Sequence, residues 1–300
     1  MDALVLEQVC KSFGTLRAVD SLSARVPAGS VYGFLGPNGA GKTTILRMML
    51  DIIRPDTGRI RILDNDSLEQ AKDAVGYMPE ERGLYPRMKV RDVLEYLASL
   101  KGVKKGDIGG RIRDWLKTVD LVEWGEKKVN ELSRGMQQRL QFVAAAINNP
   151  VLLILDEPFG GLDPVNLELL KGVVLRMRDA GTTVVLSTHM MEQAENVCDY
   201  ILLINRGRKA LDGSLEEIRR RYQSRTVVVE AEGDASFVRA LPMVKSTTEV
   251  GKKLEIVLQE NADDQELLQA LVGKVRIRAF ALKVPSLREI FVNVVSSDNA

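Results

Sequence analysis

The stretch that decides the fold is VYGFLGPNGAGKTT, residues Val31–Thr44. It opens with the apolar run Val31–Leu35, which is typical of a buried strand, and Ile45–Leu50 after it is typical of a helix. Between them, Gly36–Thr43 fits the pattern G-x-x-x-x-G-K-[ST]. A strand before this pattern and a helix after it are the context in which it binds phosphate. That context disfavours the alternative of a glycine-rich turn without a ligand, and we expect a P-loop.

The residue types of the loop predict how it holds phosphate. Glycines let the backbone wrap closely around an anion with its N–H groups pointing inward. The following helix offers free N–H groups and the positive end of its dipole to the same anion. We expect Lys42 to reach the β- and γ-phosphates and Thr43 to place its hydroxyl on Mg²⁺. The predicted nucleotide-binding residues of the loop are Gly36, Pro37, Asn38, Gly39, Ala40, Gly41, Lys42, Thr43 and Thr44.

Two further apolar strands end in polar residues. Val151–Leu155 is followed by Asp156 and Glu157, and Val184–Leu186 is followed by Ser187-Thr188-His189. Ligands of a parallel α/β sheet bind beyond the carboxyl ends of its strands. If these strands are neighbours of the P-loop strand, their polar residues converge on the γ-phosphate.

Asp156, Glu157 and His189 are therefore candidates for metal binding and hydrolysis. Asp156 fits a carboxylate that holds Mg²⁺, directly or through water. Glu157 lies one residue further, and we expect it to orient or deprotonate the attacking water. His189, the one histidine of the chain, is expected to hydrogen-bond to the γ-phosphate. The structural alternatives are a capped strand end for the two carboxylates and a structural or surface position for the histidine.

Composition narrows the function classes. The 300 residues are 45% hydrophobic and 28% charged, which is ordinary for a globular chain of one large or two smaller domains. The formal net charge of +1 gives no indication of a nucleic-acid partner. No apolar run approaches the roughly 18 residues of a membrane span, and Met1–Leu4 does not open like a signal peptide. Cys10 and Cys198 are isolated, which favours a reducing, cytoplasmic location.

The remaining patterns predict two domains. From Val90 to Asn149, three apolar stripes at helical spacing predict a helical insert. The basic run Arg219–Arg221 precedes a change of rhythm, and we interpret it as a solvated helix end rather than a functional patch. The patterns after it follow the order βαββαβ, which predicts a small ferredoxin-like module. Ser286 is expected to cap a last helix.

Further motifs lie before and after the P-loop in the sequence. Phe13 lies upstream, where its ring either stacks on adenine or packs as plain core. Downstream come Tyr77–Glu81, Leu132–Arg139, Gly160–Asp163 and His189, and no Asn-Lys-x-Asp sequence that reads guanine follows the loop. With the strand that ends in Asp156-Glu157, these motifs make the chain resemble the nucleotide-binding subunit of an ABC (ATP-binding cassette) transporter, from residue 1 to about 220.

The resemblance implies which residues complete the site. Glu80 stands at the Q-loop position, where the family usually has glutamine, and is expected to touch Mg²⁺ or its water. The signature segment, Leu132–Arg139, is expected to close over the P-loop of a second subunit, with ATP held between the two chains of a homodimer. Arg134 and Met136 replace the usual glycine and glutamine there, and Gly160 replaces the usual serine of the D-loop. The signature residues implied to bind the nucleotide are Ser133, Gly135 and Met136.

The run Pro79–Pro86 and the extra C-terminal module resemble one branch of this family, the sodium-efflux-type ATPases, which are close to drug and lipid exporters. In that branch the ATPase is a separate chain that drives a separate membrane permease. The resemblance implies that Glu80–Lys89 contacts the permease and that the protein is peripheral at the inner face of the cell membrane.

The sequence as a whole predicts an α/β fold: a P-loop NTPase ABC cassette with a mixed-sheet core and a helical subdomain, followed by a small α+β ferredoxin-like domain. We expect the cassette at residues 1–222, its helical subdomain at about 88–149, and the accessory domain at 223–300. The expected function is the ATP-hydrolysing subunit of an ABC exporter. The alternative is a soluble, non-transport ABC ATPase of repair, translation or assembly.

The sequence also predicts the cofactors, partners and roles of this ATPase. The expected cofactors are ATP and Mg²⁺, and the expected partners are a second copy of the chain and a transmembrane permease, with no nucleic acid. The expected catalytic residues are Lys42, Glu157 and His189, and the expected metal-binding residues are Thr43, Glu80 and Asp156.

Overall fold

The central sheet carries the P-loop strand in its interior. In the computed structural model, which describes residues 1–65, 68–81, 83–222 and 225–297, this sheet has six strands in the order β5-β6-β7-β3-β8-β9. All neighbours are parallel except the last pair, β8 and β9. β3 and β6 are buried along their whole length, as their continuous apolar runs predict. The strands are β3 (Val31–Leu35), β5 (Val75–Met78), β6 (Leu152–Asp156), β7 (Thr183–Thr188), β8 (Tyr200–Asn205) and β9 (Arg208–Ser214).

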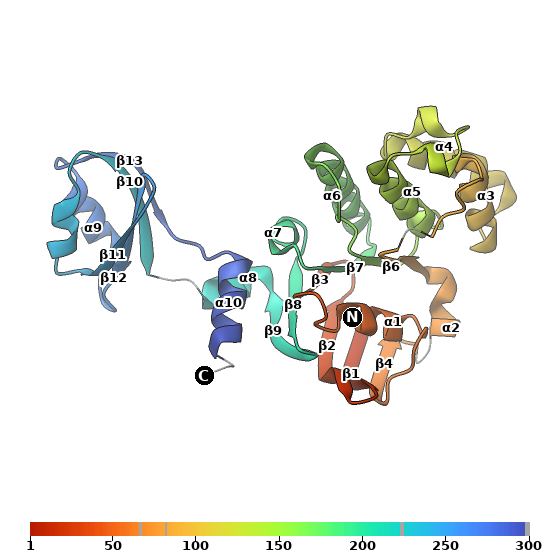
Figure 1. Ribbon diagram of the computed structural model, residues 1–300, viewed down its shortest axis with the longest axis horizontal. Coiled ribbons are helices and arrows are strands. Elements are labelled where there is room, and N and C mark those ends of the chain that lie inside the picture. Colours follow the sequence, from red (N-terminus) through yellow and green to blue (C-terminus); the bar gives the residue numbers. More distant parts are fainter. Residues whose placement is uncertain (66–67, 82, 223–224, 298–300) are drawn as a thin grey trace. The chain divides into compact units, whose positions relative to one another are not determined.

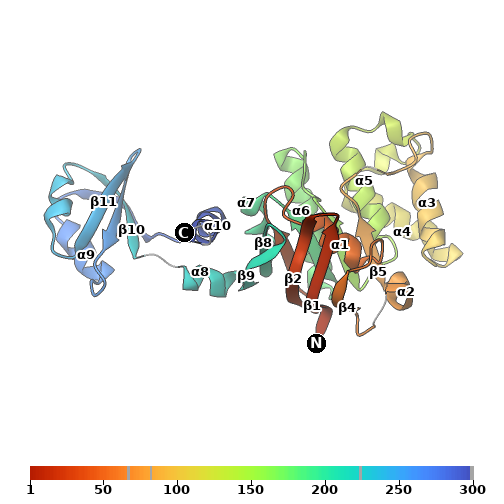
Figure 2. The same cartoon turned by 60° about the horizontal axis from the view of Figure 1, so that its bottom comes forward.

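A second, antiparallel sheet has the order β2-β1-β4 and lies beside helix α1 (Lys42–Met49) (Figure 2). Its strands are β1 (Asp2–Phe13), β2 (Leu16–Pro27) and β4 (Thr57–Ile62). One hydrophobic core joins inward residues of this sheet, of α1 and of the central sheet, among them Leu6, Val19, Ile45 and Ile154. The core therefore fixes the position of α1, and with it the start of the helix that follows the P-loop.

Sequence patterns predict β1 only over Leu4–Val9 and do not predict β2 as a strand. Both strands carry irregularities that break the two-residue alternation on which such a prediction depends. Gln8 and Ser21 have positive φ angles of 49° and 51°, and the register between β1 and β2 shifts at several points. Bulges of this kind hide a long strand from pattern analysis.

Three helices form a separate small core, which confirms the predicted helical insert (Figure 1). They are α3 (Val90–Leu100), α4 (Lys105–Thr118) and α5 (Arg134–Ala146). The predicted stripes pack together there, and Val93, Leu116 and Leu140 are fully or almost fully buried. Residues 1–215 also contain α2 (Leu68–Ala71), α6 (Pro164–Asp179) and α7 (Met191–Ala194), and short 3-10 helices at Lys72–Ala74, Val122–Trp124 and Val129–Glu131, of which the last two lie between α4 and α5.

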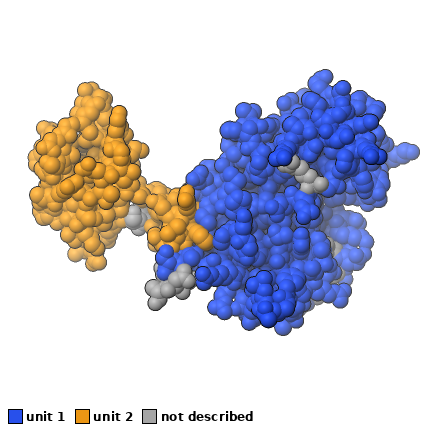
Figure 3. Space-filling view, viewed as in Figure 1, with its two compact units in different colours: residues 1–215, 294–300 blue, residues 216–293 orange. Residues whose placement is uncertain are grey.

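The chain divides into two compact units, residues 1–215 with the chain end from residue 294, and residues 216–293 (Figure 3). The predicted domain boundary after residue 222 stays a prediction. Residues 223 and 224, which follow it, lie outside the described residues, as does residue 82 of the predicted permease-contacting segment.

The second unit contains a four-stranded antiparallel sheet in the order β11-β12-β10-β13. This order and the element sequence confirm the ferredoxin-like prediction. The helix between its first two strands is a 3-10 helix, Ser236–Ala240. The predicted cap of the last helix is also present, because the backbone N of Glu289 donates to Ser286 Oγ. The elements are α8 (Leu215–Arg221), β10 (Thr226–Glu232), β11 (Val244–Val250), β12 (Lys253–Leu258), α9 (Asp264–Leu271), β13 (Arg276–Leu282) and α10 (Leu287–Ser297).

Within the described part of the chain, every helix is too short or too polar to cross a lipid bilayer.

Candidate nucleotide-binding site

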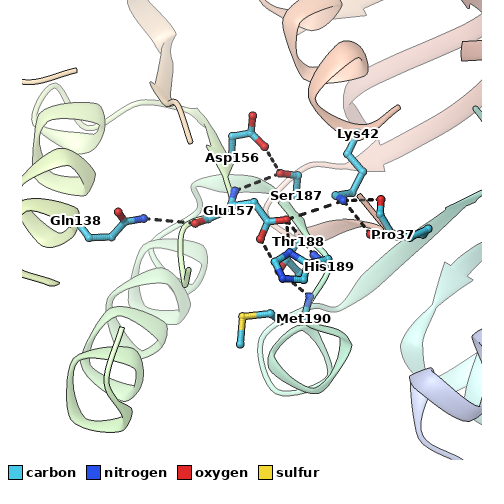
Figure 4. Close-up of polar contacts among 10 residues, drawn as sticks. Pro37, Lys42, Gln138, Asp156, Glu157, Ser187, Thr188, His189 and Met190 are labelled. Carbon is cyan, nitrogen blue, oxygen red and sulfur yellow. Dashed lines mark hydrogen bonds and ion pairs between the residues drawn. The ribbon is translucent and has the colours of Figure 1, made fainter. Parts of the chain in front are cut away.

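The three strand ends that carry polar residues are neighbours in the central sheet. β7 lies between β6 and β3, with Asp156 opposite Ser187 and Leu35 opposite Thr188. The P-loop, the acidic pair and the histidine segment therefore meet at one edge, as the sequence predicts (Figure 4).

The P-loop closes directly onto helix α1. Gly41 is the residue before the helix and has a φ of 106°, and a Cβ atom there would lie 2.5 Å from the carbonyl oxygen of Ala18. Only glycine fits this position. The amino group of Lys42 donates to the carbonyl oxygens of Gly36 (2.8 Å) and Pro37 (3.1 Å). The lysine therefore folds back along the loop, where a phosphate chain would lie.

Lys42 is buried near the carboxylates of Glu157, Asp156 and Glu80. Burial lowers its pKa, while the nearby charges of Glu157, Asp156 and Glu80 oppose that shift. Its amino group lies 3.9 Å from Glu157 Oε1. These negative groups favour the charged form of the lysine, which is the form that binds phosphate.

Asp156 has one satisfied and one unsatisfied oxygen. Its Oδ1 accepts a short hydrogen bond from Ser187 Oγ, and the hydroxyl-bearing Thr43 side chain lies near this carboxylate. Burial raises the pKa of Asp156, and the two hydroxyl groups counteract this. Its Oδ2 is buried and has no hydrogen-bond partner among the described residues. A buried carboxylate oxygen without a proton donor is suited to bind a cation.

Glu157 is held from several sides. Its backbone has a φ of 47°, and its N–H donates to Ser187 O (3.1 Å) and Oγ (3.2 Å). Its Oε1 contacts His189 Nδ1 at 2.8 Å and accepts from the backbone N of His189 at 3.1 Å. Its Oε2 accepts from Thr188 Oγ1 at 3.1 Å. The carboxylate is thus fixed beside the lysine, while half of the His189 side chain stays exposed.

A cleft of about 550 Å³ opens over the P-loop and Glu157, and Asp156 and His189 are not among the residues that line it. The predicted residues that line it are Phe13, Asn38, Gly39, Gly41, Lys42, Thr43, Thr44, Glu80 and Glu157. Gly36 and Pro37 contribute through the carbonyl oxygens that hold Lys42, and Ala40 is buried beneath the loop. The site therefore joins the P-loop to the Q-loop glutamate and to the candidate base.

Sequence reasoning missed one wall of this cleft. It is formed by Leu16, Arg17 and Ala18 at the start of β2, and by Arg206 and Gly207 in the turn between β8 and β9. The turn is tied to the P-loop because the backbone N of Gly207 donates to Ala40 O at 3.0 Å. The sequence signal there, Asn-Arg-Gly, indicates a hairpin turn but not what the turn packs against.

The signature residues do not line the cleft of their own chain. Ser133 caps helix α5, with its Oγ accepting from the backbone N of Met136 at 3.3 Å. Gly135, in the first turn, faces Leu162 and Asn166. The described structure therefore brings Ser133, Gly135 and Met136 to a helix N-terminus rather than to the P-loop.

Fold and site together define a P-loop ATPase cassette followed by a ferredoxin-like domain. Comparison with protein-family models supports this class. Residues 19–160 match the ABC transporter family, and residues 213–295 match the C-terminal domain of DrrA1-3-like ATP-binding proteins.

Known proteins match over nearly the whole chain. An uncharacterized ABC transporter ATP-binding protein, YhaQ of Bacillus subtilis, is 39% identical over 98% of this chain and 99% of its own length. The daunorubicin resistance ATP-binding protein DrrA3 of Streptomyces coeruleorubidus is 32% identical over 99% of this chain and 96% of its own length. The Nod factor export ATP-binding protein I of Cupriavidus metallidurans is 33% identical, over 98% of both chains.

A solved ATP-binding subunit of an ABC transporter superposes with a TM-score of 0.68 at 27% identity, over 73% of this chain and 93% of its own. The chain belongs to the family of ABC transporter ATP-binding proteins and is an ATPase of that family.

Proposed function

We propose that this chain hydrolyses MgATP to drive an exporter whose membrane permease is a separate chain. The observation that carries the hydrolytic part is the Glu157 carboxylate, fixed by Thr188 and His189 beside the P-loop lysine. The exporter part is supported by two relatives that match over nearly the whole chain, a daunorubicin resistance protein and a Nod factor export protein. No relative named here supports the alternative of a non-transport ATPase.

Magnesium fits the acidic edge of the site. The unpartnered Oδ2 of Asp156 and the hydroxyl of Thr43 are oxygen donors of the kind that Mg²⁺ prefers. No group of three or more Asp, Glu, His or Cys side chains is placed to hold a metal among the described residues. The ion would take its remaining ligands from phosphate oxygens and water, with Glu80 acting directly or through water. It would neutralise charge on the phosphates.

Glu157 would act on the attacking water. A carboxylate that already accepts hydrogen bonds at both oxygens is pre-oriented, which is what a water-positioning base needs. His189 holds Oε1 of this carboxylate and leaves its exposed side for the γ-phosphate. Lys42 would stabilise the charge that develops on the transferred phosphoryl group.

The site would be completed by a second copy of the chain. Ser133, Gly135 and Met136 form the start of helix α5, where the positive end of the helix dipole favours an anion. Because these residues do not line their own cleft, their anion site is available to a nucleotide held by a partner chain. ATP would then join two chains head to tail.

The permease would dock near the Q-loop from the cytoplasmic side of the membrane. Tyr85 and Tyr96 are 47% and 43% exposed and pack edge to face, with ring centroids 5.7 Å apart. Exposed aromatic side chains next to a catalytic segment are suited to a protein interface. Glu80 links this surface to the nucleotide cleft.

Glu157→Gln tests the proposal. The variant keeps the size of the side chain but not the base, so we expect ATP affinity within twofold of wild type and a loss of turnover of at least a hundredfold. We also expect gel filtration with ATP to show a dimer, because the nucleotide is not cleaved. Glu192→Gln, at an exposed position of α7, is the matched control. Wild-type turnover of Glu157→Gln would contradict the assigned role.

A further inference from the structure

Two buried glutamines connect helix α5, which begins with the signature residues, to the segments that carry Glu157 and Glu80. Gln138 and Gln141 of α5 are 3% and 4% exposed. They are three positions apart, so they share one face of the helix. Neither belongs to the groups that hold nucleotide or metal in the proposed function.

Gln138 contacts the backbone that carries the candidate base. Its Nε2 donates to the carbonyl oxygen of Glu157 at 3.4 Å (Figure 4). It also donates to the carbonyl oxygen of Pro158 at 3.2 Å. Glu157 has left-handed backbone geometry, which a glutamate adopts only when its surroundings impose it. Ser187 restrains the N–H side of this residue, and Gln138 restrains its carbonyl side.

Gln141 hydrogen-bonds in the same way to the backbone of the Q-loop, around Glu80. Its Nε2 donates to the carbonyl oxygens of Pro79 (2.8 Å) and Glu81 (2.9 Å), which flank Glu80 on both sides. All four groups that the two glutamines contact are carbonyl oxygens, which only accept hydrogen bonds. Each glutamine therefore has to direct its amide nitrogen, and not its amide oxygen, toward them. A side chain of equal size without a donor would leave buried acceptors unsatisfied.

Helix α5 begins at the signature. Its capping residue is Ser133, and Gly135 in its first turn faces Leu162 and Asn166 at the D-loop and the start of α6. A single helix thus bears the signature at one end and, one turn further, two amides bound to the segments of Glu157 and Glu80.

We propose that Gln138 and Gln141 are positioning residues of ATP hydrolysis: Gln138 orients Glu157, and Gln141 orients Glu80. The helix that offers its N-terminus to the partner's nucleotide thereby sets the geometry of its own chain's carboxylates. This inference rests on the proposed function, in which Glu157 acts on water and Glu80 acts at the metal.

The test uses the full chain with Gln138→Met and Gln141→Met, which keep side-chain length and remove the donors. For Gln138→Met we expect kcat to fall about tenfold while the Kd for MgATP stays within twofold. For Gln141→Met we expect the Mg²⁺ concentration for half-maximal rate to rise about fivefold. A purely structural role would move the melting temperature but neither of these quantities.

Asn148→Leu is the matched control. Asn148 follows the same helix, and its Nδ2 donates to the carbonyl oxygen of Asp73 at 2.9 Å, next to β5 but not lining the cleft. This variant loses the same kind of bond and should keep wild-type kcat and Mg²⁺ dependence. If either Met variant does not fold, Gln138→Asn or Gln141→Asn replaces it, because a side chain shorter by one methylene stays polar but does not reach the carbonyl groups.

The outcomes separate this inference from the proposed function. The inference would be overturned, and the proposed function left intact, by two results together. Glu157→Gln would show no turnover, and both Gln138→Met and Gln141→Met would match the Asn148→Leu control in kcat and Mg²⁺ dependence. Full turnover by Glu157→Gln would overturn both. The expected drop in kcat and rise in Mg²⁺ requirement, with MgATP affinity retained, would support the positioning roles.

Discussion

At the residue scale, the backbone of Glu157 carries a conformational penalty. A non-glycine residue in the left-handed region costs about 1–3 kcal/mol and persists only where other contacts impose it. Here the N–H of Glu157 is bound by Ser187 and its carboxylate by Thr188 and His189. The rest of the cassette thus stabilises a strained residue at the point where chemistry is proposed.

A second residue-scale feature is the unequal environment of the two cysteines. Cys10 Sγ accepts from the Ser21 backbone N at 3.2 Å and from Arg17 at 3.3 Å. Hydrogen bonds from the side chains of Thr57 and Arg17 lower the pKa of Cys10 to about 6. Both thiols are buried, Cys10 with 9% and Cys198 with 6% of its surface exposed, and Cys198 has no such donors among the described residues, so burial raises its pKa instead.

We therefore expect iodoacetamide to alkylate Cys10, with a rate that rises through about pH 6, and to leave Cys198 unmodified. Mass spectrometry of the native protein between pH 5 and 9 measures this, and Cys10→Ser is the control. Because the folded pKa is the lower one, the thiolate contributes stability above the ordinary cysteine pKa and loses it as pH falls through about 6. A labelling midpoint near pH 8.5 would contradict the assigned hydrogen bonds.

At the element scale, elements with strong periodicity follow directly from the sequence, and irregular ones do not. β3, β6 and α5 lie where their apolar patterns predict, because each is buried in the way that its pattern encodes. β2 was missed because bulges break its alternation. Arg206 was missed because its role depends on a turn packing against a loop far away in sequence. Local patterns carry no information about such long-range packing.

Helix α6 shows how a local signal sets an element boundary. The apolar pattern predicts its start near Leu167, whereas the helix begins at Pro164. Asp163 accepts hydrogen bonds from the backbone N of Val165 (3.1 Å) and Asn166 (3.0 Å), and proline is well suited to the first helical position.

Asp163→Ala should lower the free energy of unfolding of the cassette by about 1 kcal/mol, because it removes this cap. Urea unfolding followed by tryptophan fluorescence measures the change in the first unit alone, since both tryptophans, Trp115 and Trp124, belong to it. Asp163→Asn keeps a capping oxygen and should stay near wild type. Equal destabilisation by both substitutions would rule out the cap as the cause.

At the scale of the whole molecule, the nucleotide cleft is built entirely within the first unit. Every residue that lines it lies between Phe13 and Gly207. The second unit has its own core, with Val227, Ile256 and Leu267 buried. We propose that the domain boundary falls near residue 222 and that the second domain supports the dimer or its regulation.

A chain ending at residue 222 should accordingly bind MgATP with a Kd within twofold of wild type and should form a shorter-lived ATP-dependent dimer. Equilibrium binding and gel filtration measure the two effects. The chain end from residue 294 belongs to the first unit. A variant that lacks only residues 294–300 therefore distinguishes the effect of losing this chain end from the effect of losing the second unit. Loss of cooperative unfolding in the 222-residue chain would contradict the two-domain division.

The placement of β3 in the central sheet has a consequence for biosynthesis. Among the described residues, the pairing partners of β3 are β7 and β8, which follow the helical insert in sequence. The cleft wall also includes Arg206 and Gly207. Because the chain is synthesised from its N-terminus, β3 is made long before β7 and β8, and it lacks these neighbouring strands during most of translation. An interrupted chain that stops before residue 207 carries the whole P-loop motif and Glu157 but lacks part of the cleft wall, so we expect truncated products not to form the complete cleft.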